Sequence, residues 1–343
     1  NKGKNMITTA IYAIAMFCVL IFMHELGHFI AARACHVKVN KFAIGMGPAF
    51  WKKQKGETEY SLRIFPIGGF CAMEGEDEDS DEPRALNNKK AWQKAIVICA
   101  GSFMNLLLAV VLMIIFVFYI GTATTTLDAV QKGSPAEEAG LKPGDKIVMV
   151  DGNKTNEWTD VTDIITGTEN NKAEITVERN GKEYTFVTGF MKNEEGRKMI
   201  GITSARQRDP VSAVKDGAKA TFDMTVNMYE ILKRLFTGDV SAKELSGPVG
   251  IVYMVDQSIS YGFMYFLYFM SLISLNLAIV NMLPLPALDG GRLLFIIVRK
   301  ITGKAITDDM EGKIHFIGIM LLLLLMVYVT WNDIVRFIVP IFN

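Results

Sequence analysis

Long apolar stretches alternate with polar sections along this chain, and four of the apolar stretches are long enough to cross a membrane. A hydrocarbon core of about 30 Å requires roughly 20 apolar residues of helix. The first stretch is too long for a signal peptide and lacks a small-residue cleavage pattern before His24. The predicted spans have these approximate limits: Met6 to Ala32, Ala95 to Ile120, Phe263 to Leu283, and Ile314 to Thr330.

The polar sections between the spans differ in pattern. Val37 to Phe70 alternates short β-prone pieces with glycines, which predicts a small hairpin or sheet lying against the membrane. We interpret the acidic run Glu74 to Glu82 as a solvated linker, because a block of like charge rarely packs. Pro210 to Leu245 is amphipathic and helical in pattern, and is expected on the outer membrane surface.

The expected fold is therefore a polytopic α-helical membrane protein with about four transmembrane helices, a membrane-associated β-hairpin or sheet segment and an extracytoplasmic α+β domain. The boundaries that we expect are 1–36 for the first span, 37–94 for the β segment and acidic linker, 95–120 for the second span, 121–205 for the α+β domain, 206–262 for the amphipathic segment, 263–291 for the third span and its following motif, 292–313 for a loop, and 314–343 for the fourth span and tail.

Basic residues are concentrated in two loops, one after the first span and one after the third. Because short cytoplasmic loops retain Lys and Arg, we expect both loops in the cytoplasm. The central section and both termini are then expected outside, although Lys2 and Lys4 argue in the opposite direction. The basic residues counted are Arg33, Lys38, Lys41, Lys52, Lys53, Lys55, Arg63, Arg84, Lys89, Lys90, Lys94, Arg292, Arg299, Lys300, Lys304 and Lys313.

Composition agrees with a membrane protein, since half of the 343 residues are hydrophobic. The formal net charge is zero, and no cluster of aromatic and basic residues suggests base stacking, so we expect no nucleic-acid partner. No cysteine lies in the long polar middle section, where an exported fold would use disulfides, and the four are interpreted as buried thiols. They are Cys18, Cys35, Cys71 and Cys99.

The chemistry is indicated by His24-Glu25-Leu26-Gly27-His28, an HExxH pattern near the end of the first span. A spacing of four places both imidazoles on one helix face, where they can share a zinc ion, while Glu25 can reach a metal-bound water. Ionisable groups are costly in a bilayer and are retained there for a function. The alternative is that the three polar side chains only form hydrogen bonds between helices.

A catalytic zinc needs a third protein ligand, for which Asp289 is the better candidate. His36 and His315 have no motif around them and are interpreted as structural or surface histidines. Asp289 follows two prolines that end the third span, and two glycines follow it. The first and third spans cross in the same direction, so the ends carrying HExxH and Asp289 lie at one depth near the cytoplasmic side.

Two resemblances extend this interpretation. The segment GSPAEEAGLKPGDKIVMV at residues 133–150 resembles PDZ domains of bacterial envelope proteases, and the resemblance covers about residues 127–203. HELGH in the first span, this PDZ domain and NMLPLPALDGG from Asn281 together resemble the site-2 protease family, in its bacterial PDZ-containing branch. One departure is visible in the second span, where Ser102 stands in place of the proline that often precedes the asparagine, here Asn105.

The resemblance implies an intramembrane metalloendopeptidase in the bacterial plasma membrane, with Zn²⁺ held by His24, His28 and Asp289 and with Glu25 as catalytic base. It also implies substrate contacts by Asn281 and, less firmly, Asn276. The alternative for both asparagines is hydrogen bonding between helices. Implied substrates are transmembrane proteins such as anti-sigma factors and remnant signal peptides.

Three further points are open at this stage. A non-catalytic PDZ adaptor would not need Glu25, whereas a membrane-tethered peptidase for soluble peptides would use all the same residues. The PDZ domain either grips the tail of a trimmed substrate or excludes proteins with bulky outer domains. Deleting residues 127–203 distinguishes these two roles, because only the filter predicts that untrimmed substrates become cleavable.

Overall fold

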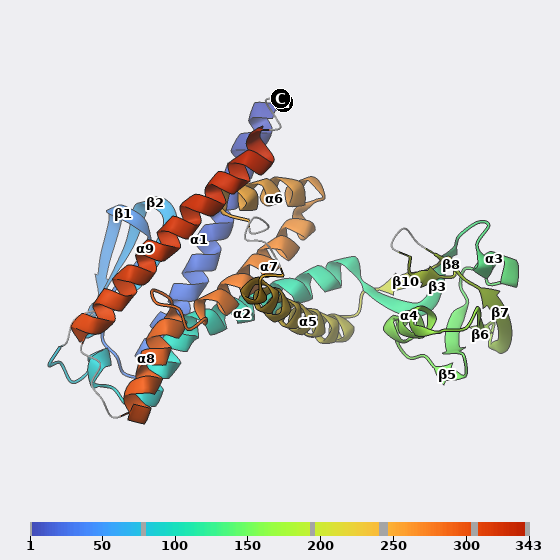
Figure 1. Ribbon diagram of the computed structural model, residues 1–343, viewed down its shortest axis with the longest axis horizontal. Coiled ribbons are helices and arrows are strands. Elements are labelled where there is room, and N and C mark those ends of the chain that lie inside the picture. Colours follow the sequence, from blue (N-terminus) through green and yellow to red (C-terminus); the bar gives the residue numbers. More distant parts are fainter. Residues whose placement is uncertain (1, 77–79, 193–195, 240–245, 303–307, 340–343) are drawn as a thin grey trace. The chain divides into compact units, whose positions relative to one another are not determined.

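The computed structural model describes residues 2–76, 80–192, 196–239, 246–302 and 308–339. The chain forms two units, one comprising residues 1–116 and 217–343 and the other residues 117–216 (Figure 1). The prediction of four membrane-spanning helices is confirmed among the described residues. Helices long and apolar enough to cross a membrane cover Met6–Ala34, Ala91–Ile120, Phe263–Asn281 and Met310–Phe337. The second therefore starts earlier than expected, and the fourth is longer at both ends.

The first unit is built from long helices. Their bounds are α1 Lys2–Ala34, α2 Ala91–Ile120, α5 Pro210–Thr237 (which begins in the second unit), α6 Pro248–Ser260, α7 Phe263–Asn281, α8 Asp289–Thr302 and α9 Asp308–Asp333, followed by a π turn at Ile334–Ile338. A 3-10 turn covers Leu86–Asn88. α6 begins with Pro248 in its first turn, where a missing N–H has no cost. α7 ends at Asn281 because Pro284 and Pro286 cannot continue a helix.

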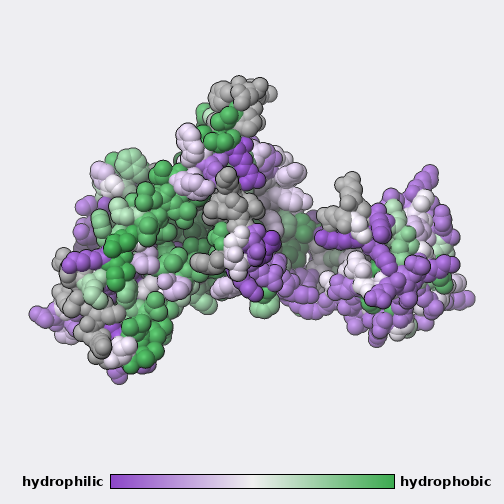
Figure 2. Space-filling model, viewed as in Figure 1, coloured by the Kyte–Doolittle hydropathy of each residue, from purple (hydrophilic) through white to green (hydrophobic). Residues whose placement is uncertain are grey.

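Many large apolar side chains in this unit point outward. Leu321, Leu324 and Val327 of α9 are 62%, 67% and 65% exposed, and Ile7 of α1 is 66% exposed. Figure 2 shows hydrophobic residues covering much of the helical unit, whereas the second unit is mostly hydrophilic. Contiguous apolar surface of this kind is expected of helices that face lipid.

The β segment is a sheet made by two long strands, β1 Val39–Lys55 and β2 Thr58–Met73. Each strand bends, so that the first half of β1 pairs with both halves of β2: Phe42 lies opposite Tyr60 on one side and Cys71 on the other. The order across the sheet is therefore 49–55, 58–63, 39–44 and 69–73. Gly45 and Gly68 adopt φ of +87° and +88° near the bends, a conformation that favours glycine.

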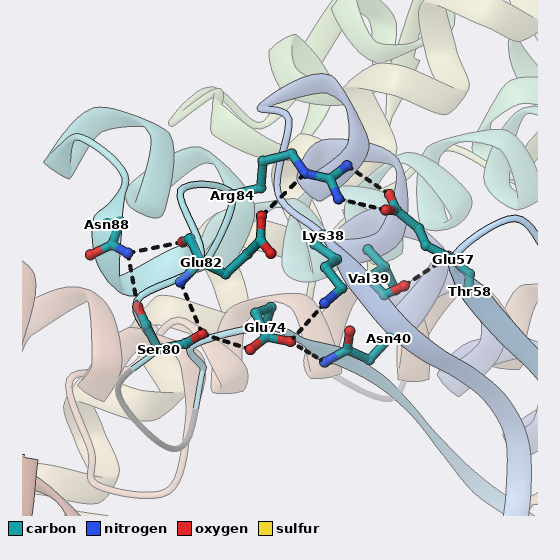
Figure 3. Close-up of polar contacts among 10 residues, drawn as sticks. All are labelled: Lys38, Val39, Asn40, Glu57, Thr58, Glu74, Ser80, Glu82, Arg84 and Asn88. Carbon is teal, nitrogen blue, oxygen red and sulfur yellow. Dashed lines mark hydrogen bonds and ion pairs between the residues drawn. The ribbon is translucent and has the colours of Figure 1, made fainter.

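The interpretation of Glu74 to Glu82 as a solvated linker is wrong for Glu74 and Glu76, whereas Asp81 is exposed and residues 77–79 lie outside the described part. Figure 3 shows the Glu74 carboxylate bound by Asn40, Lys38 and Ser80. The hydroxyl of Ser80 and the carboxamide of Asn40 hold the pKa of Glu74 down to about 2. Glu76 pairs with Arg292 of α8. The like-charged run packs because Lys38, Asn40 and Arg292 from other segments, together with Ser80 within the run, bind its carboxylates.

The second unit is an α+β domain, as the glycine-rich motif predicts. Its elements are β3 Thr122–Val130, α3 Pro135–Ala139, β4 Lys146–Val150, β5 Asn153–Lys154, α4 Trp158–Gly167, β6 Lys172–Arg179, β7 Lys182–Gly189 and β10 Ile202–Gln207, with β8 Met191–Lys192 paired to β9 Lys198–Met199. The sheet order is β10-β3-β4-β6-β7, with β5 beside β4. Ser134 caps α3 and Gly140 ends it at φ +96°. Ile147, Ile175 and Val177 are fully buried in its core.

Candidate metal centre

Two imidazoles meet on one face of α1. The Nε2 atoms of His24 and His28 lie 3.2 Å apart, and their rings stand edge to face with centroids 4.7 Å apart. The spacing of four residues accounts for this proximity, because residues i and i+4 are neighbours on a helix surface. Both side chains are nearly buried, with 13% and 11% of their surfaces exposed.

Asp289, the first residue of α8, completes a triangle with the two imidazoles. Its Oδ2 atom lies 3.3 Å from His24 Nε2 and 3.5 Å from His28 Nε2. Ligand atoms about 2.0–2.1 Å from a tetrahedral zinc ion lie about 3.3 Å from one another. The three edges of 3.2, 3.3 and 3.5 Å fit that geometry.

The space beside this triangle is kept open by a glycine of α2. A Cβ added at Gly101 would lie 2.3 Å from His28 Nε2 and 2.8 Å from His24 Nε2. Any other residue at this position would place a side chain against the ligand atoms. Gly27 has a related role between the helices, since its Cβ would lie 2.2 Å from the carbonyl oxygen of Ala100. α1 and α2 are therefore in backbone contact at the site.

α2 also fixes the orientation of both rings. His28 Nδ1 lies 2.8 Å from the carbonyl oxygen of Val97, so Nδ1 carries the proton and donates it. Asn105 is 1% exposed, and its carboxamide nitrogen lies 3.5 Å from His24 Nδ1. The Nε2 lone pair of His28 is then free to face Asp289, and that of His24 is free as well when the Asn105 amide is flipped so that its oxygen accepts from Nδ1–H. Asn105 is itself held in place by Ser274 of α7, whose hydroxyl donates to its backbone carbonyl over 2.7 Å.

A tight turn carries the chain from α7 to Asp289. Ala287 has φ +75°, a left-handed conformation that costs a non-glycine residue about 1–2 kcal/mol. A Cβ at Gly290 would lie 2.3 Å from the carbonyl oxygens of Met282 and Leu283, and one at Gly291 would lie 2.2 Å from that of Leu285. The two glycines after Asp289 are thus required by close backbone contact.

The β segment passes beside Glu25. A Cβ at Gly69 of β2 would lie 3.6 Å from Glu25 Cγ. Gly69 opens the outer segment 69–73, which pairs with β1 on one side only among the described residues. Cys71 in this segment is buried, and burial together with the carboxylates of Glu25 and Glu76 raises the pKa of its thiol. The thiol therefore stays neutral.

The structure brings together four of the residues singled out in the sequence: His24, Glu25, His28 and Asp289. Asn276 and Asn281 are half-buried in α7, and within the described chain neither carboxamide has a hydrogen-bond partner. His36 is exposed in the turn after α1 at φ +56°. His315 is in α9, where it contacts the turn before Asp289.

Sequence reasoning missed the contributions of Gly101 and Val97, and noted Asn105 only as part of a motif. A carbonyl acceptor such as that of Val97 has no signal in a single sequence. For Gly101, a glycine inside an apolar helix is a signal of close approach, although it does not name the partner.

Residues 12–325 match Peptidase family M50. The chain belongs to this family. A relative from Clostridium acetobutylicum is 38% identical over 329 residues, which are 95% of this chain and 97% of the relative. The Regulator of sigma-W protease RasP of Bacillus subtilis is 32% identical over 417 aligned residues, covering 96% of this chain and 99% of that protein.

Membership of family M50 makes this protein a zinc metalloprotease with several membrane helices, as the sequence predicted. Among solved structures, the PDZ domain of an SdrC-like protein from Listeria monocytogenes is 23% identical, covering 25% of this chain and 87% of that chain with a TM-score of 0.22. A second match is a solution structure from Geobacillus thermodenitrificans, 20% identical, covering 24% of this chain and 95% of that chain with a TM-score of 0.21.

Proposed function

We propose that this M50 protease cleaves peptide bonds of membrane-anchored proteins within or next to their transmembrane helices, using zinc held by His24, His28 and Asp289. The observation that carries the ligand assignment is the triangle of Nε2, Nε2 and Oδ2 atoms. With Nδ1 of His28 protonated toward Val97, and Nδ1 of His24 protonated toward the oxygen of the flipped Asn105 amide, three lone-pair atoms face one another within 3.5 Å. Such an arrangement is electrostatically unfavourable unless a cation lies among them.

The buried carboxylate gives independent support. Oδ2 of Asp289 is shielded from solvent and makes no hydrogen bond within the described chain. A buried carboxylate oxygen without a donor is costly, and metal coordination removes that cost. When bound, zinc supplies an acidified water, with a pKa of about 7, and polarises the scissile carbonyl.

Glu25 is proposed as the general base. It follows His24 directly in α1 and lies against Gly69, so its carboxylate is beside both the ligand cluster and the outer segment of β2. In this role it takes the proton of the attacking water and passes it to the departing amine. Glu25 is half-buried.

A helical substrate must unwind before it is cleaved, because its carbonyls are engaged in i to i−4 hydrogen bonds. We propose that the open side of segment 69–73 pairs with the unwound substrate as an added strand. Asn281, and less firmly Asn276, would hold a freed substrate carbonyl. Their carboxamides have no partner within the described chain, which favours this role over hydrogen bonding between helices.

The Bacillus relative is named a regulator of sigma-W protease, and we propose membrane-bound regulators of this kind, together with remnant signal peptides, as substrates. The distribution of Lys and Arg supports a plasma-membrane orientation with the α+β domain outside and the metal site near the cytoplasmic side. In this orientation the outer domain acts on the exposed part of the substrate, either by gripping a trimmed tail or by excluding bulky domains.

The test compares Glu25→Gln with Glu138→Gln, an exposed glutamate of α3, in cells and as purified protein. Proteomics of membrane fragments that accumulate with Glu25→Gln identifies substrates, and these are then offered to the purified variants. We expect zinc in all proteins, and cleavage by wild type and Glu138→Gln only. Cleavage that persists in Glu25→Gln would refute the mechanism, and zinc-free wild type would favour a non-catalytic adaptor.

A further inference from the structure

His315 of α9 is in direct contact with the turn that presents Asp289. Its Nδ1 atom accepts a hydrogen bond of 2.8 Å from the backbone N–H of Ala287. Because Nδ1 accepts, the ring proton is on Nε2, which faces the carboxylate of Glu311 at 3.7 Å. That carboxylate is bound in turn by Arg299 of α8 at 2.6 Å.

The residue whose amide His315 binds, Ala287, is in an unfavourable backbone conformation. Ala287 is at φ +75°, one of four non-glycine residues with positive φ in the described chain, and it lies two residues before Asp289. A strained conformation persists only where its surroundings hold it. Within the described chain, the imidazole of His315 is the group that binds the amide of this residue.

α9 contacts the same turn at a second position, Gly318. A Cβ at Gly318, one turn after His315, would lie 2.5 Å from Pro286 Cβ and 2.7 Å from Pro286 O. The ring of His315 is also packed edge-on against Phe295 of α8, with centroids 5.5 Å apart. The turn at 286–287 is therefore clamped on α9, and the imidazole is anchored to the helix that begins with Asp289.

We propose that His315 is a positioning residue for the metal centre: by binding the Ala287 amide it holds the left-handed turn and sets Asp289 Oδ2 against His24 and His28. The inference rests on the proposed ligand set, because it assigns a support to one of its members. It gives α9, which supplies no ligand, a direct part in zinc binding.

Zinc retention in purified protein tests this assignment through the rate at which a chelator removes zinc. His315→Leu lacks the acceptor, and we expect zinc loss to be roughly tenfold faster, in the range that second-shell partners of metal ligands contribute. His315→Asn places a carbonyl oxygen where Nδ1 stood and is expected to retain zinc nearly as wild type. His36→Asn, a matched change at an exposed histidine, is expected to have no effect.

A double variant separates positioning from general damage to α9. Ala287→Gly removes the penalty for positive φ, so the effect of His315→Leu should be clearly smaller in the Ala287→Gly background. Hydrogen exchange of a peptide covering residues 284–290 gives a readout independent of activity. We expect its amide protection to fall in His315→Leu and to be kept in His315→Asn.

The outcomes distinguish this inference from the proposed function. Asp289→Asn is included as a reference and must lose zinc if the ligand set is right; if it keeps zinc, the proposed function fails. If Asp289→Asn loses zinc while His315→Leu keeps it at the wild-type rate, the positioning role alone is overturned. It is also overturned if His315→Asn is as impaired as His315→Leu, or if Ala287→Gly gives no relief.

Discussion

The Nδ1 atom of His28 lies 2.8 Å from the backbone carbonyl oxygen of Val97. A carbonyl can only accept, so this contact fixes the tautomer of the imidazole and directs the Nε2 lone pair at His24 and Asp289. Because the acceptor belongs to the backbone, no side-chain substitution at position 97 removes it. The orientation of this ligand depends on the closeness of α1 and α2, which Gly27 permits.

Gly101→Ala should abolish zinc binding. The added methyl would lie 2.3 Å from His28 Nε2 and within 2.8 Å of His24 Nε2, so at least one imidazole must leave the site. We expect zinc content to fall well below stoichiometric and cleavage to fall at least 100-fold, as measured by metal analysis and substrate turnover. Gly312→Ala in α9 is the control, since nothing lies within 4 Å of its Cβ position. Full zinc in Gly101→Ala would contradict the site geometry.

Substitution of Asn105 should weaken the site without destroying it. With Nε2 of His24 facing the metal, its Nδ1–H needs an acceptor, which the Asn105 carboxamide offers through its oxygen after a flip of the amide. We expect Asn105→Leu to lose zinc affinity about 10- to 100-fold and Asn105→Asp to lose much less. Ser102→Ala, at a neighbouring buried polar residue of α2, is the control. Equal zinc affinity in the leucine and aspartate variants would argue against this role.

Cross-linking should locate the substrate at one edge of the bent sheet. In a variant whose four native cysteines are replaced, Ala72→Cys places a thiol on the outer segment beside Glu25, and Gln54→Cys places one on the opposite edge. With Glu25→Gln to prevent cleavage, we expect a substrate carrying cysteine near its scissile bond to form a disulfide with position 72. Preferential cross-linking at position 54 would show that the substrate does not pair as proposed.

The α+β domain should respond to pH through Asp145. Burial by itself raises the pKa of this carboxyl, but Arg179 and the Lys142 amide, both within hydrogen-bond distance, outweigh it and hold the pKa below its usual value. A group with a lowered folded-state pKa stabilises the fold above its unfolded value, near 4, and loses this contribution as the pH falls. Wild-type protection in β6 should therefore decline below about pH 4.

Arg179→Met should reveal how much the ion pair with Asp145 contributes to the stability of the domain. It leaves a carboxylate that is 1% exposed without its cation, and we expect a loss of about 2 kcal/mol at pH 7, reduced from the range for fully buried pairs because Arg179 is 24% exposed. The loss should shrink near pH 4, where Asp145 of the variant becomes protonated. Hydrogen exchange of β6 in the full chain measures both effects. Lys215→Met, at an exposed pair with Glu157, should leave protection unchanged.

The sequence was sufficient where the determining interactions are local or repeat along one element. Four apolar stretches predicted the membrane helices, and the spacing of His24 and His28 predicted their meeting on one helix face. Asp289 was selected because parallel spans place their ends at one depth, an argument from topology rather than from contacts.

Features that depend on partners distant in sequence could not be predicted in this way. Glu74 belonged to a run of like charge, and nothing in the run revealed that Lys38 and Asn40 would bind its carboxylate. The doubling of the β segment into four paired pieces follows from bends at glycines whose conformations only the folded chain displays. His315 has no motif, and its role depends on the strained turn that it meets.

The proposed ligands of the metal centre are far apart in the sequence, two in α1 and one at the start of α8. During synthesis, α1 enters the membrane long before the ribosome reaches Asp289, and its histidines then lack their carboxylate partner. If Asp289 is the third ligand, as proposed, the growing chain is incapable of hydrolysis until most of it has been made. With this ligand set, the order of synthesis would separate membrane insertion of the first helix from the appearance of proteolytic activity.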